Sequence, residues 1–157
     1  MISRIKEALN LFQKGQLNES KKICLEILKN QPESFDTLYL VGMIAFRQKE
    51  YSNSEELIRK AIKLRSNNAE IYNLYAIVLL HLKKFNLAIE NWSNAIKIRP
   101  DYLEAYNNQG NLLLELGKSR EALKNYEKAL ELKPDFAEAY NNQGNAFLKL
   151  KKIDKAI

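Results

Sequence analysis

Apolar and small residues recur along this chain at a fixed interval of 34 positions. The segment EAYNNQGN occupies residues 104–111 and appears again at residues 138–145. Residues 103–122 and 137–156 are identical at 12 of 20 positions. Carried back to residue 1, the same period gives units 1–34, 35–68, 69–102 and 103–136, and then a partial unit 137–157. Such a period predicts an array of stacked structural repeats.

Each unit carries the pattern of two helices that pack closely. Positions 8 and 20 of the unit are small in every copy, which lets two helix backbones approach each other. Glycine within a helix costs about 1 kcal/mol relative to alanine, so its recurrence at position 8 indicates a packing role. Position 24 is a buried apolar or aromatic residue in this interpretation. The residues at these three positions are Ala8, Gly42, Ala76, Gly110 and Gly144; Ser20, Ser54, Ala88, Ala122 and Ala156; and Cys24, Ile58, Trp92 and Tyr126.

Proline and acidic residues indicate where the helices end and begin. Pro32, Pro100 and Pro134 share position 32, and the residue before a proline is driven out of helical geometry. We therefore predict one helix over about positions 1–14 and another over about positions 17–30 of each unit. Helix N-caps are predicted where Asn or Asp precedes Glu by three residues, at Asn67, Asp101 and Asp135.

The whole pattern resembles the tetratricopeptide repeat, a 34-residue helix–turn–helix unit. The fourth unit carries the match best, through Tyr106, Gly110, Leu113, Gly117, Ala122, Tyr126, Ala129 and Pro134. The resemblance implies an all-α fold, a right-handed α-solenoid of stacked antiparallel helical hairpins, forming a single repeat domain over residues 1–157. The sequence departs from the family at Arg4, Glu7 and Ile27. It also departs at Gln109 and Gln143, whose amides need hydrogen-bond partners if they are buried.

The resemblance also implies a concave groove lined by the first helix of each unit. Positions 2, 5, 6, 9 and 13 share one helix face, and we predict that this face binds a protein or peptide segment. The face is apolar and aromatic in the second and third units and rich in asparagine in the last two. The candidate groove residues are Tyr39, Met43, Asn73, Ile77, Asn107, Asn108, Asn111, Asn141, Asn142 and Asn145.

An asparagine amide can both donate and accept, which suits the main chain of an extended peptide. Asn108 and Asn142 stand at position 6, where they resemble the asparagine ladder in the repeat domain of O-linked N-acetylglucosamine transferases. That resemblance implies that they hold the main chain of a substrate or partner. Lys6, Leu40 and Leu74 fill the same position in the other units. The alternative is that these asparagines only reflect the composition of the chain.

The patch of Tyr39, Met43 and Ile77 has two interpretations. It is either a pocket for an apolar side chain of a partner or a surface that packs against a neighbouring chain. The carboxylate-clamp mode of the family needs a lysine at position 5, where this chain has Ile5, Tyr39, Asn73, Asn107 and Asn141. That mode is not expected here.

Charge and composition exclude several classes of function. The net charge of +6 is spread over the units, with basic and acidic residues side by side, which indicates a solvated helix surface and not a nucleic-acid site. The most apolar stretch, residues 71–82, is too short to span a membrane. A lone Cys24 and a lone His81 cannot form a Cys/His metal site. They are interpreted as a core and a surface residue, no cofactor is predicted, and a cytoplasmic location is expected.

The sequence therefore predicts a protein–protein interaction scaffold and not an enzyme. Its oligomeric state does not follow from the pattern. The chain is expected to stop within its fifth repeat, where Ala156 and Ile157 occupy core positions with little helix behind them. This motivates an alternative, in which the repeats are the N-terminal substrate-recruiting arm of a larger glycosyl- or sulfotransferase.

Overall fold

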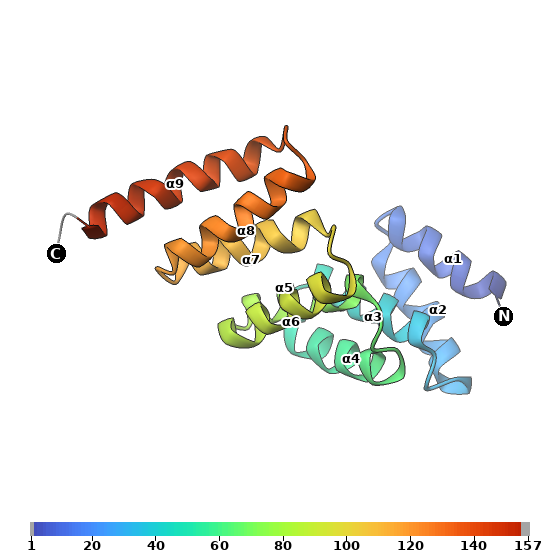
Figure 1. Ribbon diagram of the computed structural model, residues 1–157. Helices are drawn as coiled ribbons and strands as arrows, with labels where there is room; N and C mark the ends of the chain where they lie inside the picture. Colours follow the sequence, from blue (N-terminus) through green and yellow to red (C-terminus); the bar gives the residue numbers. More distant parts are fainter. Residues whose placement is uncertain (1, 155–157) are drawn as a thin grey trace. The chain divides into compact units, whose positions relative to one another are not determined.

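The computed structural model describes residues 2–154 of the chain, with side chains described for residues 4–151 (Figure 1). Over these residues the secondary structure is entirely α-helical, in nine helices joined by short turns. The helices are α1 (Ile2–Gln13), α2 (Leu17–Asn30), α3 (Phe35–Arg47), α4 (Tyr51–Leu64), α5 (Ala69–His81), α6 (Phe85–Ile98), α7 (Leu103–Glu115), α8 (Ser119–Leu132) and α9 (Ala137–Asp154). Ala156 and Ile157 lie outside the described residues.

The predicted helix positions are confirmed. Every second helix covers positions 17–30 of its unit, and every first helix from α3 to α7 covers positions 1–13. The exception is α9, which continues to Asp154 and so passes the position at which the other first helices end. Among the described residues no second helix of the fifth repeat follows α9.

The four hairpin turns share one backbone geometry. The residue at position 15 has a positive φ in each, at 79° for Gly15, 62° for Lys49, 59° for Lys83 and 77° for Gly117. In each turn the N–H of position 15 donates to the C=O of position 12, and the N–H of position 16 donates to the C=O of position 11. This is the Schellman motif, which satisfies carbonyls that the end of a helix leaves without partners.

The predicted N-caps are wrong by one residue. The cap of α5 is Asn68, whose Oδ1 accepts the N–H of Ile71 at 2.8 Å. The cap of α7 is Tyr102, which makes no side-chain capping bond. Before α7 the reason is that Pro100 takes the second place of a four-residue turn, which is closed by the Tyr102 N–H donating to the Arg99 C=O at 3.1 Å. Asp101 and Asp135 fill the third place of such turns and not the cap.

The chain divides into two compact structural units that are larger than the 34-residue repeats, Met1–Lys84 and Phe85–Ile157. From here on, the first unit and the second unit mean these two parts of the chain. In the first unit α1 packs on α2 and α3 on α4, with α2 against α3 and α4 against α5. In the second unit α7 packs on α8, with α6 against α7 and α8 against α9 (Figure 1). Within each unit the first helices of consecutive repeats also meet, α1 with α3, α3 with α5 and α7 with α9. The predicted single repeat domain over residues 1–157 stays a prediction.

Helix pairs interlock at the small positions that the sequence singled out. A Cβ added to Gly42 would lie 2.9 Å from Cγ1 of Ile58, and one added to Gly110 would lie 2.7 Å from Cε1 of Tyr126. Both partner side chains are fully buried. The glycines therefore let the second helix of a hairpin sit against the backbone of the first.

Two serine hydroxyls reinforce the same contact in the first unit. Ser20 Oγ donates to the C=O of Ala8 at 2.7 Å, and Ser54 Oγ donates to the C=O of Gly42 at 2.8 Å. Cys24 is fully buried beside them, and burial raises the pKa of its thiol to about 11. Its predicted place in the core is confirmed.

Candidate functional site

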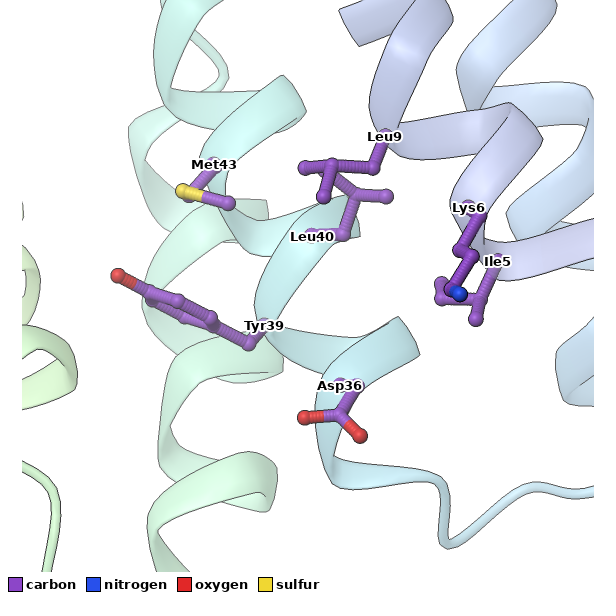
Figure 2. Close-up of a pocket in the computed structure, with 7 residues that line it drawn as sticks. All are labelled: Ile5, Lys6, Leu9, Asp36, Tyr39, Leu40 and Met43. Carbon is purple, nitrogen blue, oxygen red and sulfur yellow. The ribbon is translucent and has the colours of Figure 1, made fainter. Parts of the chain in front are cut away.

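An apolar hollow of the first unit lies between α1 and α3. Its volume is about 320 Å³, and we call it the α1–α3 hollow (Figure 2). All of its lining residues occupy positions 2, 5, 6 or 9, so the hollow is built from the helix face predicted to bind. They are Ile5, Lys6, Leu9, Asp36, Tyr39, Leu40 and Met43.

The centre of the hollow is aliphatic and its edges carry charge. Leu9 of α1 faces Leu40 of α3 (Figure 2). Leu40 is only 2% exposed and Leu9 is 41% exposed, so one side chain forms the base and the other a solvated wall. Lys6 lines the hollow from α1 and Asp36 from α3, and Asp36 also pairs with Arg65 at 3.6 Å. An occupant would bury apolar surface between two charges of opposite sign.

Aromatic contacts support the α3 side of the hollow. The rings of Tyr39 and Phe35 stack with centroids 6.0 Å apart and planes 23° apart. The guanidinium of Arg65 lies over the Phe35 ring, 3.9 Å from its centroid, within the range of a cation–π contact. Tyr39 is thus packed against a buried ring before any ligand arrives.

The remaining apolar candidate does not join the hollow. Tyr39 and Met43 both line it, whereas Ile77 and Asn73 lie half-buried on α5 and are not among its lining residues. Leu40 belongs to the helix face predicted to bind, but Ile5 and Leu9 were not predicted as site residues. Their place at positions 5 and 9 of the predicted face was the signal that could have found them.

In the second unit the same helix face carries a network of amides between α7 and α9. Asn142 donates from Nδ2 to Oδ1 of Asn111 at 2.8 Å and of Asn107 at 3.4 Å. Asn107 donates in turn to Glu138 at 2.8 Å, and the Tyr126 hydroxyl donates to Oδ1 of Asn111 at 2.9 Å. Asn107 is 4% exposed. These amides therefore bond across the repeat boundary and hold α7 and α9 together.

The network divides the predicted asparagines into two groups. Asn107, Asn111 and Asn142 bond to other side chains of the protein. The other three candidates, Asn108, Asn141 and Asn145, lie outside the network. Asn108 is half-buried, whereas Asn141 and Asn145 are exposed. The sequence did not indicate the part played by Glu138 and Tyr126. Burial raises the pKa of Tyr126 to about 12, so its hydroxyl stays protonated as a donor.

The buried Gln109 has the partners that its burial requires. Its Nε2 donates to the C=O of Ile89 at 2.9 Å and to Oγ of Ser93 at 2.7 Å. His81 is exposed, as predicted, and its ring stacks on Tyr51 with centroids 4.5 Å apart. Over the residues that the structure describes, no group of three or more His, Cys, Asp or Glu could hold a metal ion. No described helix has the length and apolarity needed to cross a bilayer.

Comparison with known families places this geometry in context. Models described as tetratricopeptide repeat match residues 5–69 and 57–90, and a model described as TPR repeat matches residues 78–117 and 110–151. Together these matches run from residue 5 to residue 151. No curated protein matches the sequence.

Solved structures with the same fold are numerous. MamA is 23% identical, with a TM-score of 0.87 over 99% of this chain and 87% of its own. YrrB, described as a TPR protein with an unusual peptide-binding site, is 21% identical, with a TM-score of 0.84 over 98% of this chain and 79% of its own. The first TPR domain of Spaghetti (RPAP3), bound to the HSP90 peptide SRMEEVD, is 29% identical, with a TM-score of 0.69 over 73% of this chain and 90% of its own. The predicted all-α solenoid class is confirmed.

Proposed function

Because the chain belongs to the tetratricopeptide repeat family, we propose that it is a protein-interaction scaffold that binds an extended peptide segment on its first helices. The observation that carries the proposal is the α1–α3 hollow, an apolar cavity of about 320 Å³ on the helix face that faces neighbouring first helices. Two similar structures support it, since one is bound to an HSP90 peptide and another is described as having a peptide-binding site. The proposed activity is binding, with no catalytic step.

The chemistry of the hollow indicates what the segment contains. Its volume accommodates one or two side chains of the size of leucine, methionine or phenylalanine, and its walls are mainly aliphatic. Fully burying such a side chain is worth about 1.5–3 kcal/mol. Lys6 at one edge favours an acidic residue beside the apolar anchor. We therefore expect a peptide with an apolar anchor and an acidic neighbour.

The asparagines outside the α7–α9 network supply a second element of the proposal. Asn108, Asn141 and Asn145 lie on the first-helix face of the second unit and present both donors and acceptors. We propose that they bond to the main chain of a bound segment. The network asparagines are proposed to hold α7 and α9 in place and not to bind the segment themselves. Their side chains bond to one another and to Glu138 and Tyr126; they are Asn107, Asn111 and Asn142.

The test begins with a random-peptide library displayed on phage and selected against the intact chain. The dissociation constant of each enriched peptide is then measured by fluorescence anisotropy. Leu9→Lys places a charge in the hollow and is expected to weaken binding at least about tenfold, which corresponds to 1.4 kcal/mol. Leu25→Lys is the matched control, because Leu25 is 47% exposed, close to the 41% of Leu9, and does not line the hollow.

Two outcomes contradict the proposal. Enriched peptides that share no apolar residue would show that the hollow does not select an anchor. Equal affinity for the Leu9→Lys and Leu25→Lys variants would show that the peptides bind elsewhere. Asn108→Ala, measured in the same assay, tests the second element separately, because it leaves the hollow intact.

A further inference from the structure

The two charged side chains that line the α1–α3 hollow differ in their surroundings. Lys6 comes from α1 and Asp36 from the facing helix α3 (Figure 2). The Lys6 side chain is exposed and makes no ion pair or hydrogen bond with the residues that the structure describes. Asp36 is paired, because Nη1 of Arg65 lies 3.6 Å from its Oδ1. The hollow therefore has one compensated charge and one uncompensated charge.

Arg65 reaches Asp36 from outside the helix face predicted to bind. It is the C-cap residue of α4, and its N–H donates to the C=O of Ala61 at 3.1 Å. Its guanidinium lies over the ring of Phe35, 3.9 Å from the centroid. Phe35 and Asp36 are consecutive, so one side chain contacts both residues at the start of α3. Arg65 and Asp36 also line a second, polar hollow of about 690 Å³, which shares Asp36 with the α1–α3 hollow.

The sequence explains why Arg65 lies beside Asp36. In repeat 69–102 the arginine at position 31, Arg99, lies over Tyr102 at position 34, 3.5 Å from the ring centroid. Repeat 35–68 has Asn68 at position 34 instead, where its side chain caps α5. Because no aromatic ring stands at that position, Arg65 lies over Phe35 at position 1 of its own repeat. The contact with Asp36 follows from this difference.

The ion pair has more influence on charge than on stability. The side chain of Arg65 is 52% exposed and that of Asp36 is 69% exposed, and ion pairs this exposed add little to the stability of a fold. They do change the field that a bound group meets, because complementary charges favour the correct partner and like charges disfavour the wrong one. With Asp36 compensated, Lys6 decides which sign of charge is favoured beside the apolar centre.

We propose that Arg65 is a specificity-determining residue of the α1–α3 hollow. By pairing with Asp36 it leaves Lys6 as the effective charge, so that an acidic residue beside the apolar anchor binds better than a basic one. Arg65 acts through Asp36 and is not itself a lining residue of this hollow. The inference rests on the proposed function, since it concerns the same hollow and the same bound segment.

The test uses a peptide enriched by selection, synthesised in two forms that carry either Glu or Lys next to the apolar anchor. Fluorescence anisotropy gives both dissociation constants for the intact chain, and the constant of the Lys form divided by that of the Glu form is the charge preference. For the parent chain we expect a preference of at least about fivefold. Arg65→Gln leaves Asp36 uncompensated and should lower the preference at least about threefold.

Three variants separate the charge of Arg65 from its other effects. Arg59→Gln removes the same charge from another exposed position of α4, outside both hollows, and should leave the preference unchanged. Arg65→Lys keeps the charge without the planar guanidinium and should retain the preference within about twofold. Asp36→Asn, added to Arg65→Gln, removes the uncompensated acid and should restore the preference. A merely structural part for Arg65 would not be rescued in this way.

The inference is overturned if the parent chain does not prefer the Glu form or if Arg65→Gln leaves the preference as it was. It is also overturned if Arg59→Gln lowers the preference as much, or if Asp36→Asn does not restore it. Leu9→Lys distinguishes these failures from a failure of the proposed function. If Leu9→Lys weakens both peptides, they occupy the hollow and only the assignment of Arg65 fails. If it weakens neither, the peptides bind elsewhere and both proposals fail.

Discussion

Replacing Gly110 or Gly144 by alanine should have opposite effects on stability, although both occupy position 8 of a repeat. Alanine is favoured over glycine within a helix by about 1 kcal/mol. At Gly144 an added Cβ meets no atom within 4 Å, so the full gain is available. Gly144→Ala should raise the free energy of unfolding by about 1 kcal/mol, which is about 2–4 °C in Tm for a chain of this size.

At Gly110 the same methyl group meets a side chain that cannot move aside. The added Cβ would lie 2.7 Å from Cε1 of Tyr126 and 3.1 Å from two further ring atoms, against an ordinary carbon–carbon contact of about 3.5–4.0 Å. Tyr126 is fully buried and its hydroxyl bonds to Asn111 at 2.9 Å. Overpacking of this kind costs about 1–3 kcal/mol. Net of the helix gain, Gly110→Ala should lower stability by up to about 2 kcal/mol.

Urea unfolding followed by circular dichroism measures both effects. A Tyr126→Leu background provides the control, because it removes the ring atoms that the methyl group would strike. In that background Gly110→Ala should cost at least about 1 kcal/mol less than in the parent chain, as a coupling between residues in contact requires. If Gly110→Ala stabilises the parent as much as Gly144→Ala does, then the glycine at position 8 is not a packing requirement and the reasoning fails.

Three further predictions concern the amide network, a turn and alkaline pH. Asn142→Ala removes the donor shared by the α7–α9 network and should destabilise the chain by about 1–2 kcal/mol in the urea assay. The control is Asn141→Ala, at an exposed neighbouring residue, which should change stability by less than about 0.5 kcal/mol. Lys49→Gly should stabilise by about 0.5–1 kcal/mol, because Lys49 has a φ of 62° that costs a non-glycine residue about 1 kcal/mol; a loss in thermal unfolding would contradict this. Stability should fall as the pH rises above about 9. Burial raises the pKa of Cys24 to about 11 and that of Tyr126 to about 12 in the folded chain, whereas the unfolded chain releases both protons at lower pH. A pH-independent Tm between pH 8 and 11 would refute this.

The repeat period predicted the helices because packing and sequence share it. Small residues recur at positions 8 and 20 in every repeat, and proline recurs at position 32 in three of the four complete repeats, so these positions indicate helix bounds without reference to a ligand. The N-caps were less predictable. Asp101 carries the signal of a cap, yet Pro100 begins a turn that takes Asp101 as its third residue and leaves Tyr102 at the cap. The preference of Pro100 for a turn therefore outweighed the preference of Asp101 for an N-cap.

The site was predictable as a face and less so as a set of residues. Tyr39 and Met43 line the α1–α3 hollow because positions 5 and 9 of one helix face the neighbouring first helix. The amides of Asn111 and Asn142 stand at comparable positions, yet they bond to each other at 2.8 Å. Which amides pair depends on the register between α7 and α9, and a single sequence does not state that register. An amide that can bond to a ligand can equally bond to its neighbour.

The central claim is that the α1–α3 hollow receives an apolar side chain of a bound segment. The chain has two methionines, and one of them, Met43, lines the hollow. Its ε-methyl group, labelled with ¹³C, is therefore a reporter placed at the site. Titration with a peptide enriched by selection should shift the Met43 methyl resonance to saturation, at the dissociation constant measured by anisotropy. A resonance that does not move while the peptide binds would contradict the account.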